Sequence, residues 1–592
     1  MIVLLGLLMG ACIDIPEIQH VVEDADAGYV EPGDASTPDA GGHSLQVGLV
    51  TSRRVTNGSV DVRIELTGPV PELVELLVDG ERVATMLPPY RTQWNTQVLA
   101  EGQHELHARA TLGSRVFLSV PHQLTVDRTL PTWLTRSPST GSRFVAVGQV
   151  AQALFSESLD PTTVHSNSVR MFAGAEAITA TVSLSTDGTA VAVSPLSSLP
   201  LDVPVKVTFT DSVTDLAGNS ISPGEQEWSW TVPGYLPLGA PLLTDVPTSM
   251  LPYRVELQIG KAGQPVVAWA DSSRFAVFVR RWTGETWELL GPPLKSGSAD
   301  AAPGLTALRL DENDQPVVAW VEPAEHFVFV RRWNGATWEE MGAAVPSPLN
   351  VWGLSLRTDG SGKWFLSFMA GNNAGSRFLI WEWEEDHWVQ LGAALKVDTN
   401  ASLTGGFMGF DGTGNPLAMW SERTSGGATT VHMRRWSSGN WVPLSHSFST
   451  LDGIWGSDAK GRLLCAFPQG SGVWVWGWDD TAWGKVGTPM DELFPGAPHA
   501  ELGGFASDPT GALVALLREP ESSGQPEALY ARRLREGNWE RVGGLLRLQP
   551  DQSPSTYPAF AIAPTGRFLV ARGEYSEGTP NVRPIRVYIS NE

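Results

Sequence analysis

The strongest constraint on this chain is a phrase that returns at intervals of about 50 residues through its C-terminal half. The phrase reads Trp-x-x-Leu-Gly or a close variant, and its copies begin at Trp287, Trp338, Trp388, Trp441, Trp483 and Trp539. Two other phrases keep the same spacing: Pro-Val-Val-Ala-Trp, as at 265–269 and 316–320, and Phe-Val-Arg-Arg-Trp, as at 278–282 and 329–333. A fixed internal period of this length indicates one supersecondary unit copied many times.

Each copy predicts four short strands separated by turns that are rich in Gly and Asp, which is the pattern of a β-propeller blade. The second phrase occurs seven times, and its anchor residues are Trp269, Trp320, Phe368, Trp420, Phe467, Leu517 and Arg572. The Trp-x-x-Leu-Gly strand follows it only six times, but residues 235–242 carry a matching Leu-Gly ending one period before Trp287. We therefore predict a seven-bladed propeller over residues 234–592, in which residues 235–242 complete the last blade and leave no open sheet edge.

Two further modules, at 43–128 and 129–233, show alternating apolar residues broken by turn signals, as half-buried strands should. The second contains Val213-Thr214-Asp215-Leu216-Ala217-Gly218-Asn219 and Trp228-Ser229-Trp230. These motifs resemble the Ig-like domain of the S-layer SbsA type, and the resemblance implies a spacer. In the first module, which resembles bacterial Ig-like domains, His104 and His107 should face opposite sides of one strand and make poor co-ligands. The predicted fold class is all-β: two Ig-like β-sandwiches followed by the propeller.

The N-terminal segment predicts a targeting signal. An apolar run, Ile2 to Met9, leads into Gly10, Ala11 and Cys12. This arrangement resembles the lipobox of bacterial lipoproteins, which implies lipidation of Cys12 and attachment to the outer membrane or cell surface. The alternative is a plain signal peptide with an incidental cysteine. Residues 13–42 are acidic and poor in large apolar residues, so we expect a disordered tether after a signal peptide at 1–12.

Charge and motif content narrow the function. The net charge of −23 disfavours nucleic acid as a partner, so the lipid anchor is the one membrane contact we expect. The two cysteines, Cys12 and Cys465, have no second thiol near them, and Cys465 lies in an apolar run that predicts a buried, inert thiol. The sequence contains no nucleophile elbow, zinc motif or phosphate loop, so no cofactor is expected. Calcium is the weak exception, because Asp311-Glu312-Asn313-Asp314 only partly imitates a calcium loop.

One set of residues stands out as a candidate site. Two residues after each second-strand anchor the chain carries Asp271, Glu322, Ala370, Glu422, Gln469, Glu519 and Glu574, five of which are carboxylates. We predict that these five form an acidic ring on the face that carries the loops between second and third strands, where it would attract a cation or a cationic ligand. The alternative is that each carboxylate pairs with an arginine such as Arg280 or Arg281. Arg518, Arg572 and Tyr575 could donate hydrogen bonds to a polyhydroxyl or carboxylate ligand on the same face.

Three hypotheses of function remain open. The first is a non-catalytic surface binding or adhesion protein whose propeller recognises a glycan, a matrix component or an envelope protein. The second is a glycan hydrolase or lyase, because propellers host such sites and fold does not decide function. The third is a structural part of an envelope assembly.

Overall fold

The computed structural model describes residues 44–142, 145–242, 255–271, 275–295, 304–322, 326–347, 350–446, 453–458, 461–469, 472–491, 501–520, 527–547, 558–574 and 584–591. The predicted signal peptide, Cys12 and the predicted tether lie outside these residues. The chain divides into a first unit that ends at Asp127 and a second that begins at Arg128. The described residues form strands apart from one turn of 3-10 helix, η1 (Asn373–Gly375), so the predicted all-β class is confirmed. No described helix has the length and apolarity needed to cross a membrane.

The first unit is a sandwich of two sheets. Its strands are β1 (Gln46–Thr51), β2 (Val55–Thr56), β3 (Ser59–Thr67), β4 (Leu73–Val78), β5 (Glu81–Thr85), β6 (Arg91–Asn95), β7 (Gly102–Leu112), β8 (Arg115–Leu118) and β9 (His122–Val126). One sheet has the order β1-β3-β6, and the other has the order β2-β9-β7-β4-β5, with β8 paired to β7. Alternation sets the core: Val60, Val62 and Ile64 of β3 are buried, and the residues between them are exposed.

Two histidines singled out in this unit have separate structural partners. His104 Nδ1 lies 2.6 Å from a carboxylate oxygen of Asp79, and His107 Nε2 lies 2.8 Å from one of Glu105. Each ring therefore neighbours its own carboxylate on β7 or on the turn after β4.

The second unit begins with another sandwich. Its strands are β10 (Trp133–Ser137), β11 (Ala151–Phe155), β12 (Val169–Ala173), β13 (Glu176–Ile178), β14 (Ala180–Leu184), β15 (Ala190–Pro195), β16 (Pro204–Phe209) and β17 (Glu227–Thr231). They form the sheets β10-β11-β15-β14 and β13-β12-β16-β17 around a core that includes Trp228 and Trp230. The buried carboxylate of Asp215 accepts hydrogen bonds from the backbone N–H of Gly218 (2.7 Å) and from the backbone and side chain of Asn219 (both 2.8 Å). This turn has the local bonding expected for it from the sequence.

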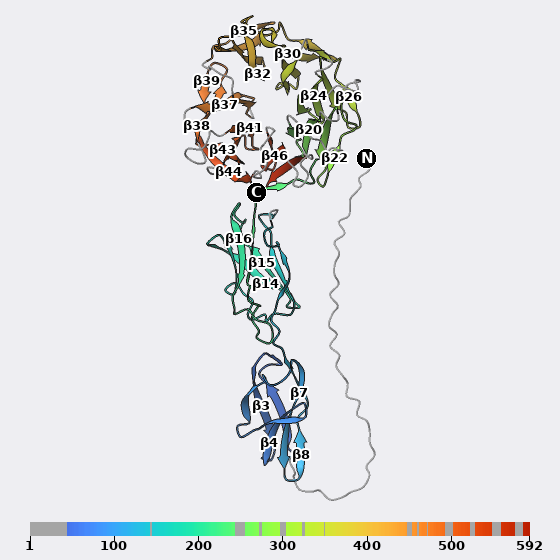
Figure 1. Ribbon diagram of the computed structural model, residues 1–592, viewed down its shortest axis with the longest axis vertical. Helices are drawn as coiled ribbons and strands as arrows, with labels where there is room; N and C mark the ends of the chain where they lie inside the picture. The colour runs from blue at the N-terminus through green and yellow to red at the C-terminus, as the bar shows by residue number, and fades with distance from the viewer. Residues whose placement is uncertain are drawn as a thin grey trace, which may run out of the picture. The chain divides into compact units, whose positions relative to one another are not determined.

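After the second sandwich, the described residues form seven sheets that follow one another around a ring (Figure 1). Blades one to three are β19 (Val255–Ile259), β20 (Pro265–Asp271), β21 (Ala276–Trp282) and β22 (Trp287–Leu289); β23 (Thr306–Leu310), β24 (Pro316–Glu322), β25 (Phe327–Trp333) and β26 (Trp338–Glu340), with β27 (Val345–Pro346); and β28 (Val351–Thr358), β29 (Trp364–Ala370), β30 (Arg377–Glu384) and β31 (His387–Gln390). Blades four and five are β32 (Ser402–Phe410), β33 (Pro416–Arg423), β34 (Thr429–Ser437) and β35 (Asn440–Pro443); and β36 (Ile454–Ser457), β37 (Leu463–Gln469), β38 (Gly472–Trp478) and β39 (Trp483–Lys485), with β40 (Met490–Asp491). Blades six and seven are β41 (Glu501–Ser507), β42 (Leu513–Pro520), β43 (Glu527–Arg535) and β44 (Asn538–Arg547); and β45 (Ala559–Ile562), β46 (Phe568–Gly573), β47 (Ile585–Ser590) and β18 (Tyr235–Pro237).

The ring closes through β18, the strand predicted from the repeat count. β18 pairs antiparallel with β47, with Leu236 opposite Ile589. The N–H of Leu238 donates to the carbonyl of Val587, and the N–H of Leu242 donates to that of Ile585, both at 2.8 Å. In Figure 1 the green strand lies beside the red strands of the last blade. Segments from the two ends of the propeller therefore complete one sheet.

The Trp-x-x-Leu-Gly phrase bonds neighbouring blades to one another at four of its copies, which begin at Trp287, Trp338, Trp388 and Trp441. Trp287 Nε1 donates to the carbonyl of Leu238 at 2.7 Å, and Trp441 Nε1 donates to that of Leu391 at 2.9 Å. The glycine of the phrase has positive φ, and a Cβ on Gly239 would lie 2.4 Å from the ring of Trp282. Glycine is thus required there both by its conformation and by the next blade's tryptophan. These tryptophans have the packing role that the sequence predicted.

The second sandwich is bonded to the propeller through hydrogen bonds between side chains and backbone groups. The carboxylate of Asp202 accepts from the N–H of Gly234 (3.2 Å) and from the N–H of Leu545 in β44 (2.7 Å). The buried side-chain amide of Asn591 donates to the carbonyls of Val145 (2.7 Å) and Pro233 (2.9 Å). A sandwich loop and the residue that follows β47 are therefore fixed to the same linker.

Candidate functional site

The candidate acidic positions lie where they were expected, at the ends of the second strands. Asp271 and Glu322 end β20 and β24, Glu422 is the penultimate residue of β33, and Glu574 directly follows β46. All four are buried, with exposed fractions of 7, 0, 2 and 5%. Glu519 lies in β42, but its side chain is outside the described part of the chain. The four described carboxylates are thus inside the blades, and a role in binding a ligand stays a prediction.

Glu422 shows what one of these buried carboxylates does. Its Oε1 accepts from Trp420 Nε1 and from the N–H of Val397, and its Oε2 accepts from the N–H of Asp398, all at 2.7 Å. Val397 and Asp398 belong to the connection between blades three and four. The His432 ring packs at a tilt of 31° against Trp420, and its Nε2 lies 3.6 Å from a carboxylate oxygen of Glu422. Glu422 therefore fastens a blade-to-blade connection to the second strand of the following blade.

In two other blades the carboxylate at this position also accepts a hydrogen bond from the side chain two residues before it. Trp320 Nε1 donates to Glu322 at 2.8 Å. Arg572 Nε donates to Glu574 at 2.8 Å, and Arg586 Nε lies 3.0 Å from the same carboxylate. Residues two apart on a strand point to the same face, which makes these pairings local. The anchor residue itself is therefore the partner that sequence reasoning missed, and the Trp-x-Glu spacing was its signal.

Several expected donors have other partners. Arg280 donates to the carbonyl of Trp287 at 3.1 Å, and Arg281 donates to that of Asp314 at 2.9 Å. Both arginines therefore reach away from the acidic position of their blade, because Arg280 lies opposite Val267 in the register and Asp271 lies opposite Ala276. Arg572, expected to serve a ligand, is bound to Glu574. Arg518 lies in β42 opposite Glu501, and Tyr575 is outside the described residues.

A hollow of about 500 Å³ lies at the opposite end of the strands. Four blades line it through the turns between their first and second strands, with Lys261, Arg309, Asp311, Asp314, Ser507 and Asp508 among the polar residues. Second strands begin at these turns and end at the acidic positions, so the hollow lies on the face away from the predicted ring. Its volume is in the range of small-ligand sites. Lys261 and Arg309 lie outside the repeated phrases, which is why the repeat did not reveal them.

Hydrogen bonds already occupy the carboxylates that line the hollow. Asp311 accepts from the N–H of Asn313 and Gln315, at 2.9 and 2.8 Å, and Asp314 accepts from the N–H of Lys261 at 2.8 Å. Asp508 accepts from its own turn and lies 2.9 Å from Arg533 Nε.

The pKa of Asp508 bears on catalysis. Burial opposes its ionisation, but hydrogen bonds from Thr510 and Ala512 and the charge of Arg533 outweigh burial and lower its pKa. A general acid must hold its proton near neutral pH, so this carboxylate is shifted in the wrong direction for that role. Cys465 is buried, and burial raises the pKa of its thiol, in line with the inert role predicted for it.

Sequence comparison identifies one module. Residues 127–232 match the family described as a bacterial Ig-like domain, Big_5. This match agrees with the sandwich seen there and with the Ig-like character predicted from its motifs. No curated protein matches the chain.

Solved structures resemble the chain over little more than half of its length. A protein of unknown function from Dyadobacter fermentans is 13% identical, with 60% of this chain and 99% of that chain covered and a TM-score of 0.34. An ulvan lyase bound to a saccharide is 12% identical, with 60 and 96% covered and a TM-score of 0.39. The polysaccharide lyase Uly1 is 10% identical, with 57 and 90% covered and a TM-score of 0.37. At these scores and identities the similarities carry no information about the activity of this chain.

Proposed function

We propose that the protein is a non-catalytic surface binding protein whose propeller recognises a glycan or an envelope protein. The observation that supports this most directly is the hollow shared by four blades, which both polar and apolar residues line. It contains the cations Lys261 and Arg309, which donate to the backbone carbonyls of Glu312 (2.6 Å) and Leu308 (2.7 Å), and its described carboxylates are engaged as well. That combination favours holding a polar ligand over transferring a proton.

The test uses the labelled full chain on glycan arrays and on arrays of purified envelope proteins, with and without calcium. Arg309→Ala should reduce binding of the selected ligand by about tenfold, the loss expected for one charge-assisted contact. Arg535→Ala is the matched control, because this arginine is 66% exposed at the end of β43. Unchanged binding by Arg309→Ala would remove the hollow as the site.

A turnover assay tests the enzyme alternative. Arrayed glycans that bind are incubated with the chain and examined for new reducing ends or unsaturated products. No product is expected at any pH between about 5 and 8, where a general acid–base pair would work. Release of product would overturn the non-catalytic proposal, and a stable stoichiometric partner in pull-downs would favour the structural alternative.

Attachment at the surface is part of the same proposal. Lipidation of Cys12 would tether the described domains through residues 13–42, and that acidic stretch is too polar to form a core of its own. Metabolic labelling with a radioactive or clickable fatty acid should mark the protein and should fail for Cys12→Ser. Labelling that persists in Cys12→Ser would contradict the proposed anchor.

A further inference from the structure

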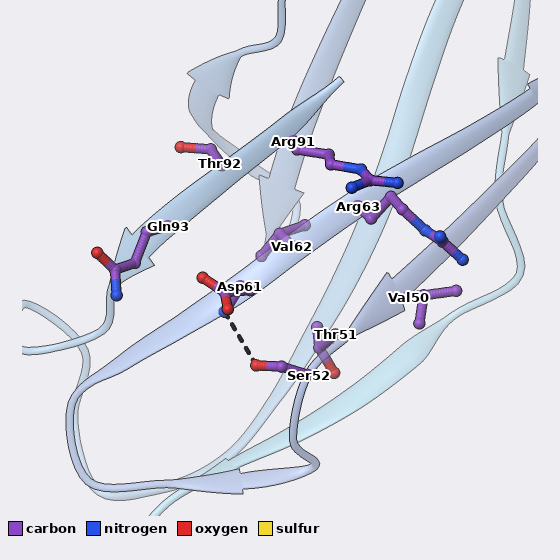
Figure 2. A pocket seen from close by; sticks show the side chains of 9 residues that line it. All are labelled: Val50, Thr51, Ser52, Asp61, Val62, Arg63, Arg91, Thr92 and Gln93. Carbon is purple, nitrogen blue, oxygen red and sulfur yellow. Dashed lines mark hydrogen bonds between the residues drawn. The ribbon is translucent and has the colours of Figure 1, made fainter. Parts of the chain in front are cut away.

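The exposed face of the β1-β3-β6 sheet in the first sandwich carries a groove of about 460 Å³ (Figure 2). Alternation along β3 sends Val60 and Val62 into the core and leaves Asp61 and Arg63 outside. Arg91 and Gln93 of β6 are exposed in the same way. The groove therefore lies over the sheet, and planar polar side chains are among the residues that line it, together with Val50, Ser52 and Thr92.

The register arranges these side chains in two rows. Arg63 lies directly opposite Arg91, and Asp61 lies directly opposite Gln93. Figure 2 shows the guanidinium groups of Arg63 and Arg91 side by side and Gln93 on the other side of Asp61. Like charges directly opposite each other in an antiparallel pair are unfavourable, so this row costs the free protein stability.

Two charged side chains that line the groove have hydrogen-bonding capacity left for a ligand. Arg63 forms an ion pair with Glu65 on its own strand. Arg91 has no ion pair and no side-chain hydrogen bond within the described residues, and neither does the Asp61 carboxylate. Asp61 takes part through its backbone N–H, which donates to Ser52 Oγ at 3.1 Å. A guanidinium and a carboxylate with open capacity therefore stand in adjacent rows of one groove.

We propose that this groove binds an acidic sugar residue of a polysaccharide, a second binding site independent of the propeller. The sugar carboxylate would lie against Arg63 and Arg91, where it would offset the like-charge pair. Asp61 accepts and Gln93 both donates and accepts, which suits vicinal hydroxyl groups. The volume is in the range of small-ligand sites. A peptide carboxylate is the less favoured ligand, because Val50 is the sole exposed large apolar side chain among the described lining residues.

Titration calorimetry with trigalacturonate and neutral galactotriose tests the proposal on the full chain. The acidic trisaccharide should bind at least about tenfold more tightly than the neutral one, and Arg91→Gln should lose that preference. Arg115→Gln is the matched control, because Arg115 is an exposed strand residue of the same sandwich, outside the groove. Arg91→Gln should keep or raise the unfolding temperature, since it removes one of two opposed charges.

A variant of the propeller hollow separates this proposal from the one for the propeller. Arg309→Ala should bind trigalacturonate like the unaltered chain, even if it abolishes recognition by the hollow. If Arg91→Gln bound trigalacturonate as tightly as the unaltered chain does, the groove would not be the binding site. No binding of trigalacturonate to the unaltered chain at millimolar concentration would also overturn the proposal. A tripeptide with a free carboxyl terminus that binds more tightly than trigalacturonate, and whose amidated form does not, would overturn the assignment to a sugar.

Discussion

The backbones of Gly234 and Gly544 touch. A Cβ on Gly544 would lie 2.3 Å from the Cα of Gly234, and a Cβ on Gly234 would lie 2.5 Å from the Cα of Gly544. Gly234 belongs to the linker after the second sandwich, and Gly544 belongs to the outer strand of blade six. Beside them, the Asp202 carboxylate accepts hydrogen bonds from the backbone N–H groups of Gly234 and Leu545. The absence of two side chains thus permits the hydrogen bonds that join sandwich and propeller.

Gly544→Ala should destabilise this joint. The added methyl must displace backbone or the carboxylate of Asp202, which lies 2.7 Å from its position, at a cost of about 1–3 kcal/mol. Differential scanning calorimetry should show a lower unfolding temperature for the variant. Gly484→Ala is the control, because a Cβ there meets no atom within 4 Å. Equal unfolding temperatures for Gly544→Ala and the unaltered chain would contradict the close approach.

Leu238→Pro should open the ring. Proline has no N–H to donate to Val587, and the lost pairing would leave an edge of β47 uncovered. We expect higher oligomers in size-exclusion chromatography and a loss of about 3 kcal/mol or more in the free energy of unfolding. Leu238→Ala keeps the N–H and isolates the effect of the side chain. Monomeric behaviour of Leu238→Pro at the concentration used for Leu238→Ala would argue against closure by β18.

Glu422→Ala should loosen the connection between blades three and four. It removes the acceptor for three donors, including the backbone N–H groups of Val397 and Asp398. Leaving such donors without an acceptor costs about 1–3 kcal/mol each, so the urea midpoint should fall clearly. Hydrogen exchange at Val397 and Asp398 should accelerate. Glu384→Ala, at an exposed position at the end of β30, should change neither quantity.

Stability should depend on pH through Asp508. Its pKa is lowered in the folded chain, so ionised Asp508 stabilises the fold at pH values above the ordinary aspartate pKa of about 3.9. That contribution disappears as the pH falls through the folded-state pKa. Asp508→Asn should therefore be less stable than the unaltered chain at pH 7, and the difference should shrink towards pH 2.

Urea unfolding at a series of pH values measures this difference. Asp386→Asn is the control, since the Asp386 side chain is 94% exposed. A stability difference between Asp508→Asn and the unaltered chain that stays constant from pH 7 to pH 2 would contradict the lowered pKa.

The sequence predicts the propeller because the same short motifs recur in each blade. The hydrogen bond from Trp287 to the carbonyl of Leu238 matches the one from Trp441 to Leu391, so the number of motif copies identifies the closing segment. The repeated motifs indicate less about the candidate sites than about the fold. The repeat places Glu322 and Glu422 at equivalent positions, and the spacing of two residues points to the tryptophan that donates to each carboxylate. The burial of Glu422 and its bonds with the N–H groups of Val397 and Asp398 depend on the connection between blades, which the spacing of residues does not encode.

The two candidate sites were missed for related reasons. Arg309 and Lys261 meet residues near Asp508 because blade six and blade two face a common axis, a relation set by the ring as a whole. Arg63 and Arg91 meet through strand register, although 27 positions separate them along the chain. Single residues outside any repeat give no signal until the sheets that carry them are placed.

The pairing of β18 with β47 makes ring closure depend on the last of the described propeller strands to be synthesised. Until Ile585 to Ser590 emerge, the strand after the second sandwich has nothing to pair with, and the six preceding blades wait as an open arc. A copy cut short before Ile585 would present unpaired β18 and β46 edges to proteases and to other chains. A closed ring can therefore form only after synthesis has passed Ser590, so a chain that lacks β47 cannot complete the last blade.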